Sequence, residues 1–289
     1  DINVAGFNPC VEQQLEDAEL CCLVETFPAK HNDMEDYLKT LKIAYLYGKT
    51  ITLSNTHWPE TNAKMLKNRR IGLSQSGVIQ AFNKHGRREV YTWCDQAYEY
   101  IQKLDEEYSN WLCIPKSIRT TSIKPSGTVS LLNGSTPGIH FPEDEYYIRR
   151  IRFSKDSNLI QALSDAGYKY EDDVYSPNTV CFEFPVHEPF FVKGKRDVSM
   201  WEQLEIAAQY QHYWADNSVS ITVTFKPEEA SFIKDALEMY ESRLKAVSFL
   251  RYEETGYEQA PYEPITKKKY DELIKNITPV NRIDTDEQG

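Results

Sequence analysis

The stretch Asn-Pro-Cys-Val-Glu at residues 8–12 carries a thiol and a carboxylate two positions apart. Pro9 after Asn8 favours an irregular loop over a helix. In an extended loop residues i and i+2 point the same way, so the Glu12 carboxylate is expected beside the Cys10 sulfur. Because a nearby carboxylate disfavours a thiolate, this pairing favours a sulfur that reacts as a neutral thiol or a radical. A loop cysteine beside a solvated glutamate is the other interpretation, and the local sequence leaves both open.

The other cysteines are less informative. The chain has six cysteines and no Cys-x-x-Cys pair, so neither a zinc knuckle nor a thioredoxin-type motif is expected. Cys94 falls on the apolar stripe of an expected helix, and Cys113 and Cys181 have apolar neighbours. These three are predicted to be core residues.

A second stretch, Lys124 to Pro142, begins Lys-Pro-Ser-Gly-Thr. Its turn precedes an expected helix start, where free backbone N–H groups and the hydroxyls of Ser126 and Thr128 would form an anion site. It is not a Walker loop, because the Gly-Lys-Ser/Thr ending is absent. A purely structural turn is the other interpretation. The basic run at 148–153 would either face phosphates or form a solvated edge.

Composition excludes several classes of partner. The 289 residues carry a formal net charge of -11, which argues against nonspecific binding to nucleic acid or to an anionic membrane. No apolar stretch approaches the roughly 20 residues that span a bilayer, and no signal peptide is evident. We therefore expect a cytoplasmic protein with reduced thiols, no nucleic-acid partner and no membrane partner.

The elements that must position these residues alternate between helix and strand. Helices are expected at about 33–48, 89–108, 156–166 and 199–214, and a further one from 227. Strands are expected at 50–55, 218–225 and 246–250. Such alternation predicts an α/β fold with largely parallel strands. Residues 268–289 are charged and are expected to form a mobile tail.

Together the two chemical stretches resemble the ribonucleotide reductases. "NPCVE" followed by "ELCCLVETFP" resembles their active-site loop, and the likeness is closest to the monomeric, adenosylcobalamin-dependent, class II ribonucleoside-triphosphate reductases. Five further motifs follow in the same order: "NRRIGLSQSG", "KPSGTVSLLNGSTPGIHFP", "YYIRRIRFS", "QYQHYWADNSVSITVTF" and "YEQAPYEPIT". The resemblance covers nearly all of residues 6–267.

The resemblance implies a role for each matching residue. Cys10 matches the cysteine that becomes a thiyl radical, and Glu12 matches the carboxylate that takes the proton of the ribose 3'-hydroxyl. Asn8 matches the amide that orients the substrate hydroxyls. Cys21, rather than Cys22, matches one of the two cysteines oxidised to a disulfide. The turn that holds the substrate phosphates corresponds to Ser126, Gly127, Thr128, Val129 and Ser130.

The same resemblance implies a fold, a cofactor and partners. We expect half of a ten-stranded α/β barrel as one domain over 1–267, with mostly parallel strands and a finger loop at 6–25. Adenosylcobalamin would generate the radical, ribonucleoside triphosphates would be the substrates, and a thioredoxin-like protein would supply electrons.

The sequence departs from the family in one respect that matters for catalysis. The partner thiol of Cys21 is expected on an upstream strand, and no cysteine follows Cys181 to serve as a C-terminal shuttle pair. We therefore expect a C-terminal half that works with a companion chain carrying the N-terminal half-barrel. The alternatives are a catalytically idle nucleotide-binding or interaction module, a glycyl-radical reductase suggested by Thr255–Tyr257, and a diiron class I reductase fragment.

Overall fold

The computed structural model describes residues 2–252 and 258–280. The chain divides into two compact units, the first made of 1–141 and 198–252 and the second of 142–197 and 253–289. The expectation of a single domain over 1–267 stays a prediction. Thr255–Tyr257, considered above as a glycyl-radical loop, lies outside the described residues.

Unit 1 carries most of the described helices and most of the described strands. Its helices are α1 (Met34–Ile51), α2 (Pro59–Asn68), α3 (Val78–His85), α4 (Arg87–Leu112), α5 (Val129–Leu132), α7 (Met200–Tyr213), α8 (Ile233–Tyr240) and the 3-10 turns η1 (Pro28–Lys30) and η3 (Pro227–Phe232). Its strands are β1 (Gly6–Phe7), β2 (Gln14–Leu15), β3 (Leu23–Thr26), β4 (Gly72–Gln75), β8 (Thr222–Phe225) and β9 (Ser248–Arg251).

Parallel strands form the centre of unit 1. β3 pairs with β4 and β8 pairs with β9, both in parallel. The segment 119–123 joins the two pairs, because Leu73 bridges to Thr121 and Ile123 bridges to Val219, again in parallel. Five parallel segments therefore run side by side within the described part of unit 1. This arrangement agrees with the expected α/β fold.

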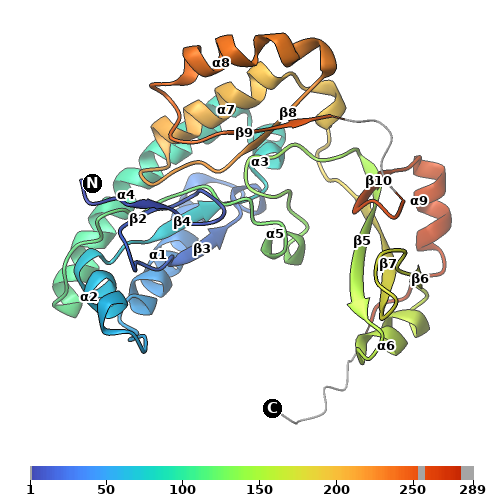
Figure 1. Ribbon diagram of the computed structural model, residues 1–289, viewed down its shortest axis with the longest axis horizontal. Coiled ribbons are helices and arrows are strands. Elements are labelled where there is room, and N and C mark those ends of the chain that lie inside the picture. Colours follow the sequence, from blue (N-terminus) through green and yellow to red (C-terminus); the bar gives the residue numbers. More distant parts are fainter. Residues whose placement is uncertain (1, 253–257, 281–289) are drawn as a thin grey trace. The chain divides into compact units, whose positions relative to one another are not determined.

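Apolar faces of the helices bury the core of this unit. α1 packs on α4 and on β3, and α7 packs on α4 and β8; Figure 1 shows α7 and α8 beside β8 and β9. Tyr37, Leu41 and Tyr45 repeat every four residues along α1 and are fully buried. Burial of a side chain of this size stabilises the fold by roughly 1.5–3 kcal/mol.

Helix α1 differs from its expected bounds at both ends. The helix begins at Met34, and Asp33 caps it by accepting a hydrogen bond of 2.9 Å from the backbone N–H of Asp36. Gly48 does not end the helix, which continues through Ile51, so the strand expected at 50–55 is absent. Gly48 instead allows close packing, since a Cβ there would lie 3.1 Å from Cγ2 of Val24.

Unit 2 is built on an antiparallel sheet, which the expectation of mostly parallel strands did not include. The sheet order is β10-β5-β7-β6. Its elements are β5 (Tyr146–Ser154), β6 (Lys169–Asp172), β7 (Thr179–His187), β10 (Tyr262–Pro264), α6 (Leu159–Asp165), α9 (Lys267–Ile274) and the 3-10 turn η2 (Lys195–Asp197).

Two expectations about unit 2 change with the structure. The basic run at 148–153 lies in β5, where Arg150 donates to Glu183 at 2.7 Å and Arg152 donates to Asp173 at 3.0 Å. These arginines thus pair with carboxylates within their own unit. Residues 267–274, placed mostly in the charged tail, form helix α9, which packs against β5 and β7. Residues 281–289 lie outside the described part.

Candidate active site

The β1–β2 hairpin carries three of the predicted site residues in a tight turn. The backbone N–H of Val11 donates to the carbonyl of Asn8 at 2.9 Å, and that of Gln13 donates to the Asn8 side chain at 3.0 Å. Val11 has a left-handed backbone with φ of 66°. The turn is thus closed rather than extended, and it leaves Cys10 exposed while Glu12 is fully buried.

The three oxygen atoms of Glu12 have different surroundings. Its backbone carbonyl accepts from the N–H of Ser218 at 3.1 Å, which ties the hairpin to the segment before β8. Its side-chain Oε1 accepts from Nζ of Lys124 at 3.2 Å. Its Oε2 is buried and has no hydrogen-bond partner among the described residues. A buried carboxylate oxygen without a partner is costly unless a ligand completes it.

Lys124 is the residue that the sequence analysis did not assign to the site. Its Nζ lies 4.0 Å from Sγ of Cys10 as well as 3.2 Å from Glu12. Burial acts to lower the pKa of Lys124, but the charge of Glu12 and the hydrogen bond to it outweigh burial and raise that pKa. Lys124 is therefore a cation at neutral pH. Nothing local in the sequence indicates this contact, because 112 positions separate Lys124 from Glu12.

Cys21 lies beside the same hairpin. The side chain of Asn8 hydrogen-bonds to it, and the charges of Glu12, Lys124 and Cys10 all act on it. Burial and then the Glu12 carboxylate raise the pKa of Cys21, although the Asn8 hydrogen bond opposes them. Cys21 is therefore a neutral thiol at physiological pH, a form that donates a hydrogen atom rather than acting as a thiolate nucleophile.

Two buried carboxylates, each in an ion pair, anchor the segment between the hairpin and Cys21. Arg70 donates to Oε1 of Glu19 at 3.0 Å, with both side chains fully buried. Lys64 pairs with Glu16 at 2.6 Å. Asn68 donates to both glutamates at 3.1 Å. Because their partners lie in and just after α2, these contacts fix the path of the chain into Cys21.

Gly72 lets the hairpin lie close against β4. A Cβ at this position would lie 2.5 Å from Nε2 of Gln13, 2.6 Å from Cδ2 of Leu23 and 2.7 Å from Oγ of Ser122. All three distances are shorter than a real Cβ contact allows. Since Gln13 follows Glu12 directly, the absence of a side chain at Gly72 helps to set the depth at which Glu12 is buried.

The turn predicted to hold phosphates begins beside Lys124. The N–H groups of Ser126 and Gly127 donate back within the turn, at 2.9 and 2.7 Å. Those of Thr128 and Val129 make no backbone hydrogen bond within the described chain, and both residues are exposed. Ser130 is buried, and its Oγ has no partner among the described residues. This turn leads into α5, a single helical turn.

A second acidic residue, also missed in the sequence, lies under this turn. Glu25 of β3 accepts from Oγ of Ser76 at 2.6 Å and Oγ of Ser74 at 3.2 Å, and the Ser126 side chain bonds to it as well. Burial raises the pKa of Glu25 to about 7, against the hydrogen bonds from these serines and the charge of Lys124. The predicted phosphate turn and β3 thus share one hydrogen-bond network.

The remaining cysteines divide into two groups. Cys94 and Cys181 are buried, as predicted. The prediction for Cys113 is wrong, because this residue is exposed. It caps the C-terminal end of α4 in a left-handed conformation with φ of 54°, so its apolar neighbours do not enclose it.

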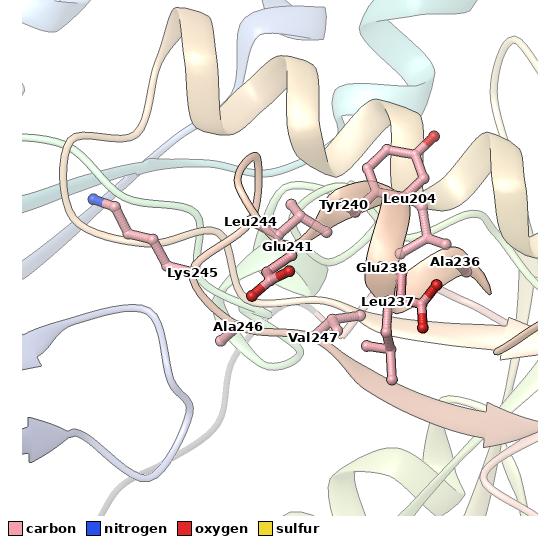
Figure 2. Close-up of a pocket in the computed structure, with 10 residues that line it drawn as sticks. All are labelled: Leu204, Ala236, Leu237, Glu238, Tyr240, Glu241, Leu244, Lys245, Ala246 and Val247. Atoms are coloured by element: carbon pink, nitrogen blue, oxygen red, sulfur yellow. The ribbon is translucent and has the colours of Figure 1, made fainter. Parts of the chain in front are cut away.

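A separate cavity of about 370 Å³ lies between α7, α8 and the segment that leads to β9. Figure 2 shows its lining side chains, among them Leu204, Leu237, Tyr240 and Val247. None of the predicted site residues lines this cavity. Among the residues that the structure describes, no helix combines the length and the apolar character needed to cross a bilayer.

Known proteins share the sequence of this chain over nearly its whole length. The chain is 51% identical over 285 residues to a Dictyostelium discoideum protein named "Probable adenosylcobalamin-dependent ribonucleoside-triphosphate reductase", covering 97% of this chain and 38% of that protein. It is 49% identical to the adenosylcobalamin-dependent ribonucleoside-triphosphate reductase of Euglena gracilis, covering 96% and 38%. The chain thus spans well under half the length of these relatives. No family model matches it.

Solved structures of ribonucleotide reductases also match this chain. A crystal structure of a B-12 dependent, class II ribonucleotide reductase superimposes with a TM-score of 0.88 and 34% identity, covering 96% of this chain and 43% of that one. The α subunit of the Actinobacillus ureae class Id ribonucleotide reductase shares the fold alone, with a TM-score of 0.63 at 15% identity. These comparisons confirm the resemblance noted in the sequence.

Proposed function

We propose that this chain, a homologue of the adenosylcobalamin-dependent ribonucleoside-triphosphate reductases over almost its whole length, carries the radical cysteine of such an enzyme and reduces ribonucleotides to 2'-deoxyribonucleotides. One observation carries the proposal. Glu12 is fully buried, with one carboxylate oxygen bound by Lys124 and the other without a partner among the described residues. A substrate hydroxyl would complete that second oxygen.

The residues around Glu12 fit a radical reduction. The Cys10 sulfur is exposed at the tip of the hairpin, where a cofactor outside the chain can reach it. When bound, adenosylcobalamin would supply the radical that removes the hydrogen atom from the Cys10 thiol. Cys10 would then take the hydrogen atom from C3' of the ribose, which requires the two atoms to be in contact.

Glu12 and the neighbouring groups would complete the reaction. The free Oε2 of Glu12 accepts the 3'-hydroxyl proton as a general base, which promotes departure of the 2'-hydroxyl as water. Asn8, whose carbonyl oxygen is already bound by Gln13, orients the substrate hydroxyls through the amide hydrogen left after its bond to Cys21. Cys21 and a second thiol supply two electrons and two protons and become a disulfide.

The substrate phosphates would bind at the turn formed by Ser126, Gly127, Thr128, Val129 and Ser130. The unpaired N–H groups of Thr128 and Val129 and the exposure of both residues support this assignment. The triphosphate form is inferred from the names of the relatives.

The second reducing thiol would come from outside the described residues. Cys22, Cys94 and Cys181 are buried. Cys113 is exposed at the C-terminal end of α4, and the groups that act on Cys21 are Glu12, Asn8, Lys124 and Cys10. Together with the five parallel segments of unit 1, this supports half of a ten-stranded barrel, with 6–25 as its finger loop. We infer that a companion chain carries the other half, including the partner thiol, and that a thioredoxin-like protein reduces the disulfide.

The test is deoxynucleotide formation by the complete reductase that contains this chain, with adenosylcobalamin and a dithiol. Cys10→Ser should abolish product formation while folding and nucleotide binding persist, because oxygen cannot replace sulfur as the radical carrier. Cys113→Ser, which changes another exposed thiol, should leave activity unchanged. Activity of the Cys10 variant above a few percent of wild type would sink the proposal.

The companion chain has its own test. After one turnover without added reductant, mass spectrometry of disulfide-linked peptides should find Cys21 joined to a cysteine that is not among the six of this chain. A Cys21–Cys22 product, or repeated turnover by this chain alone, would show that the companion is unnecessary.

A further inference from the structure

We propose that Lys124 is a further residue of the catalytic site, which holds Glu12 in the orientation for proton transfer and sets the charge beside the Cys10 sulfur. The inference rests on the proposed function, since it assigns Lys124 a part in the same reaction. The observation behind it is that the ammonium group of Lys124 contacts both the Cys10 thiol and the Glu12 carboxylate, the two groups that would react.

The geometry is specific. Nζ of Lys124 donates to Oε1 of Glu12 at 3.2 Å and lies 4.0 Å from Sγ of Cys10. Because Oε1 is bound, the carboxylate plane is fixed and Oε2 becomes the oxygen left for a substrate hydroxyl. Without the ammonium, Oε1 would lose the side-chain hydrogen bond that distinguishes it from Oε2.

The backbone of Lys124 is held as firmly as its side chain. Its N–H donates to Oγ of Ser74 in β4 at 2.9 Å. Pro125 follows it and restricts its backbone to extended conformations. The same residue begins the turn proposed for the phosphates, so one residue joins the part of the site that would bind the substrate to the part that would react.

The charges also require a cation here. The Glu12 side chain is fully buried and that of Lys124 is about one-third exposed, at 30%. Lys124 is the cation paired with Glu12, and it approaches from the side of the phosphate turn. A buried carboxylate without a cation beside it would disfavour the approach of an anionic nucleotide. Lys124 therefore allows Glu12 to act as a base beside a polyphosphate.

The experiment compares three variants in the complete, adenosylcobalamin-loaded reductase: Lys124→Met, Lys124→Gln and Lys124→Arg. Steady-state kcat and KM and equilibrium nucleotide binding are measured for each, together with thermal unfolding. We expect Lys124→Met and Lys124→Gln to lower kcat by about a hundredfold, the usual size of a lost acid–base contribution. Nucleotide affinity should change far less, and Lys124→Arg should recover a substantial part of kcat.

Lys195→Met is the matched control. Lys195 pairs with Glu143 at 3.0 Å and is similarly buried, with 28% of its side chain exposed, but it lies in unit 2. This variant should keep wild-type kcat. If Lys124→Met does not fold, the other two variants still separate the effect of the charge from the effect of side-chain packing. Lys124→Gln removes the positive charge, whereas Lys124→Arg keeps it.

Two results would overturn the role of Lys124: a kcat within about threefold of wild type in both neutral variants, or an Arg variant no more active than Gln. An equal fall in kcat for Lys195→Met would reduce Lys124 to a stabilising residue. Failure of the proposed function looks different, because the wild-type reductase would then form no deoxynucleotide at all.

Discussion

Cys21 and Cys22 are adjacent in the chain but lie in opposite environments. Cys21 is exposed beside the hairpin, whereas Cys22 is only 4% exposed and donates its thiol to the carbonyl of Gly48 at 3.5 Å. Burial raises the pKa of Cys22 to about 11. Cys22 is thus an inert core residue, although it is the same residue type one position away.

This difference predicts separate effects of two substitutions. Cys21→Ser should abolish repeated turnover in the complete reductase, because the thiol that would be oxidised is lost. Cys22→Ala should keep most of the activity and lower the free energy of unfolding by roughly 1–2 kcal/mol, as expected for a lost core side chain. Activity assays and urea unfolding test both. Loss of turnover in a folded Cys22→Ala variant would contradict the assignment.

The raised pKa of Glu25 predicts that the free energy of unfolding falls as the pH rises. Its pKa in the folded protein is about 7, against an ordinary value of 4.5, chiefly because of burial. The folded state therefore binds this proton more tightly than the unfolded state. The resulting stabilisation is complete below pH 4.5 and is lost as the pH rises through 7, by about 3 kcal/mol at most.

The measurement is the free energy of unfolding in urea at pH 5 and pH 8, for wild type and for Glu25→Gln. The variant cannot ionise at this position, so its stability should change less between the two pH values. An equal pH dependence in both proteins would show that Glu25 does not titrate in this range.

The predicted phosphate turn has a small side-chain contribution. The Ser126 hydroxyl is engaged with Glu25, so the phosphates would be held mainly by backbone N–H groups. Ser126→Ala should therefore weaken nucleotide binding by only about 1 kcal/mol, or roughly fivefold in Kd. Equilibrium binding measures this. A co-crystal structure with the phosphates elsewhere and this turn covered would refute the site.

The buried pair of Arg70 and Glu19 predicts a large loss of stability. Both side chains are fully buried, so Glu19→Gln would remove the charge of the carboxylate that Nε of Arg70 contacts at 3.0 Å. We expect a loss of roughly 3–5 kcal/mol in the free energy of unfolding. Glu35→Gln breaks a solvent-exposed pair with Lys39 and should change the free energy of unfolding far less. Similar losses for the two variants in urea unfolding would contradict this account.

Local signals in the sequence were sufficient for several elements. Helix α7, expected at about 199–214, follows Ser199, whose Oγ accepts a hydrogen bond of 3.2 Å from the N–H of Glu202. Burial of Val219, Ile221 and Val223 follows the alternation of apolar residues before and within β8. Capping and periodicity involve residues a few positions apart, so the sequence displays them directly.

The sequence by itself also determined the chemistry at residues 8–12, because thiol, amide and carboxylate are set by residue type. Only the tertiary structure decided how they are arranged. The turn closes instead of extending, and Glu12 is buried while Cys10 is exposed. Lys124 contacts Glu12 across 112 positions of the sequence and Cys10 across 114. Parallel strands joined through helices bring distant segments together, and which side chains then meet depends on register and packing, which no local pattern in the sequence encodes.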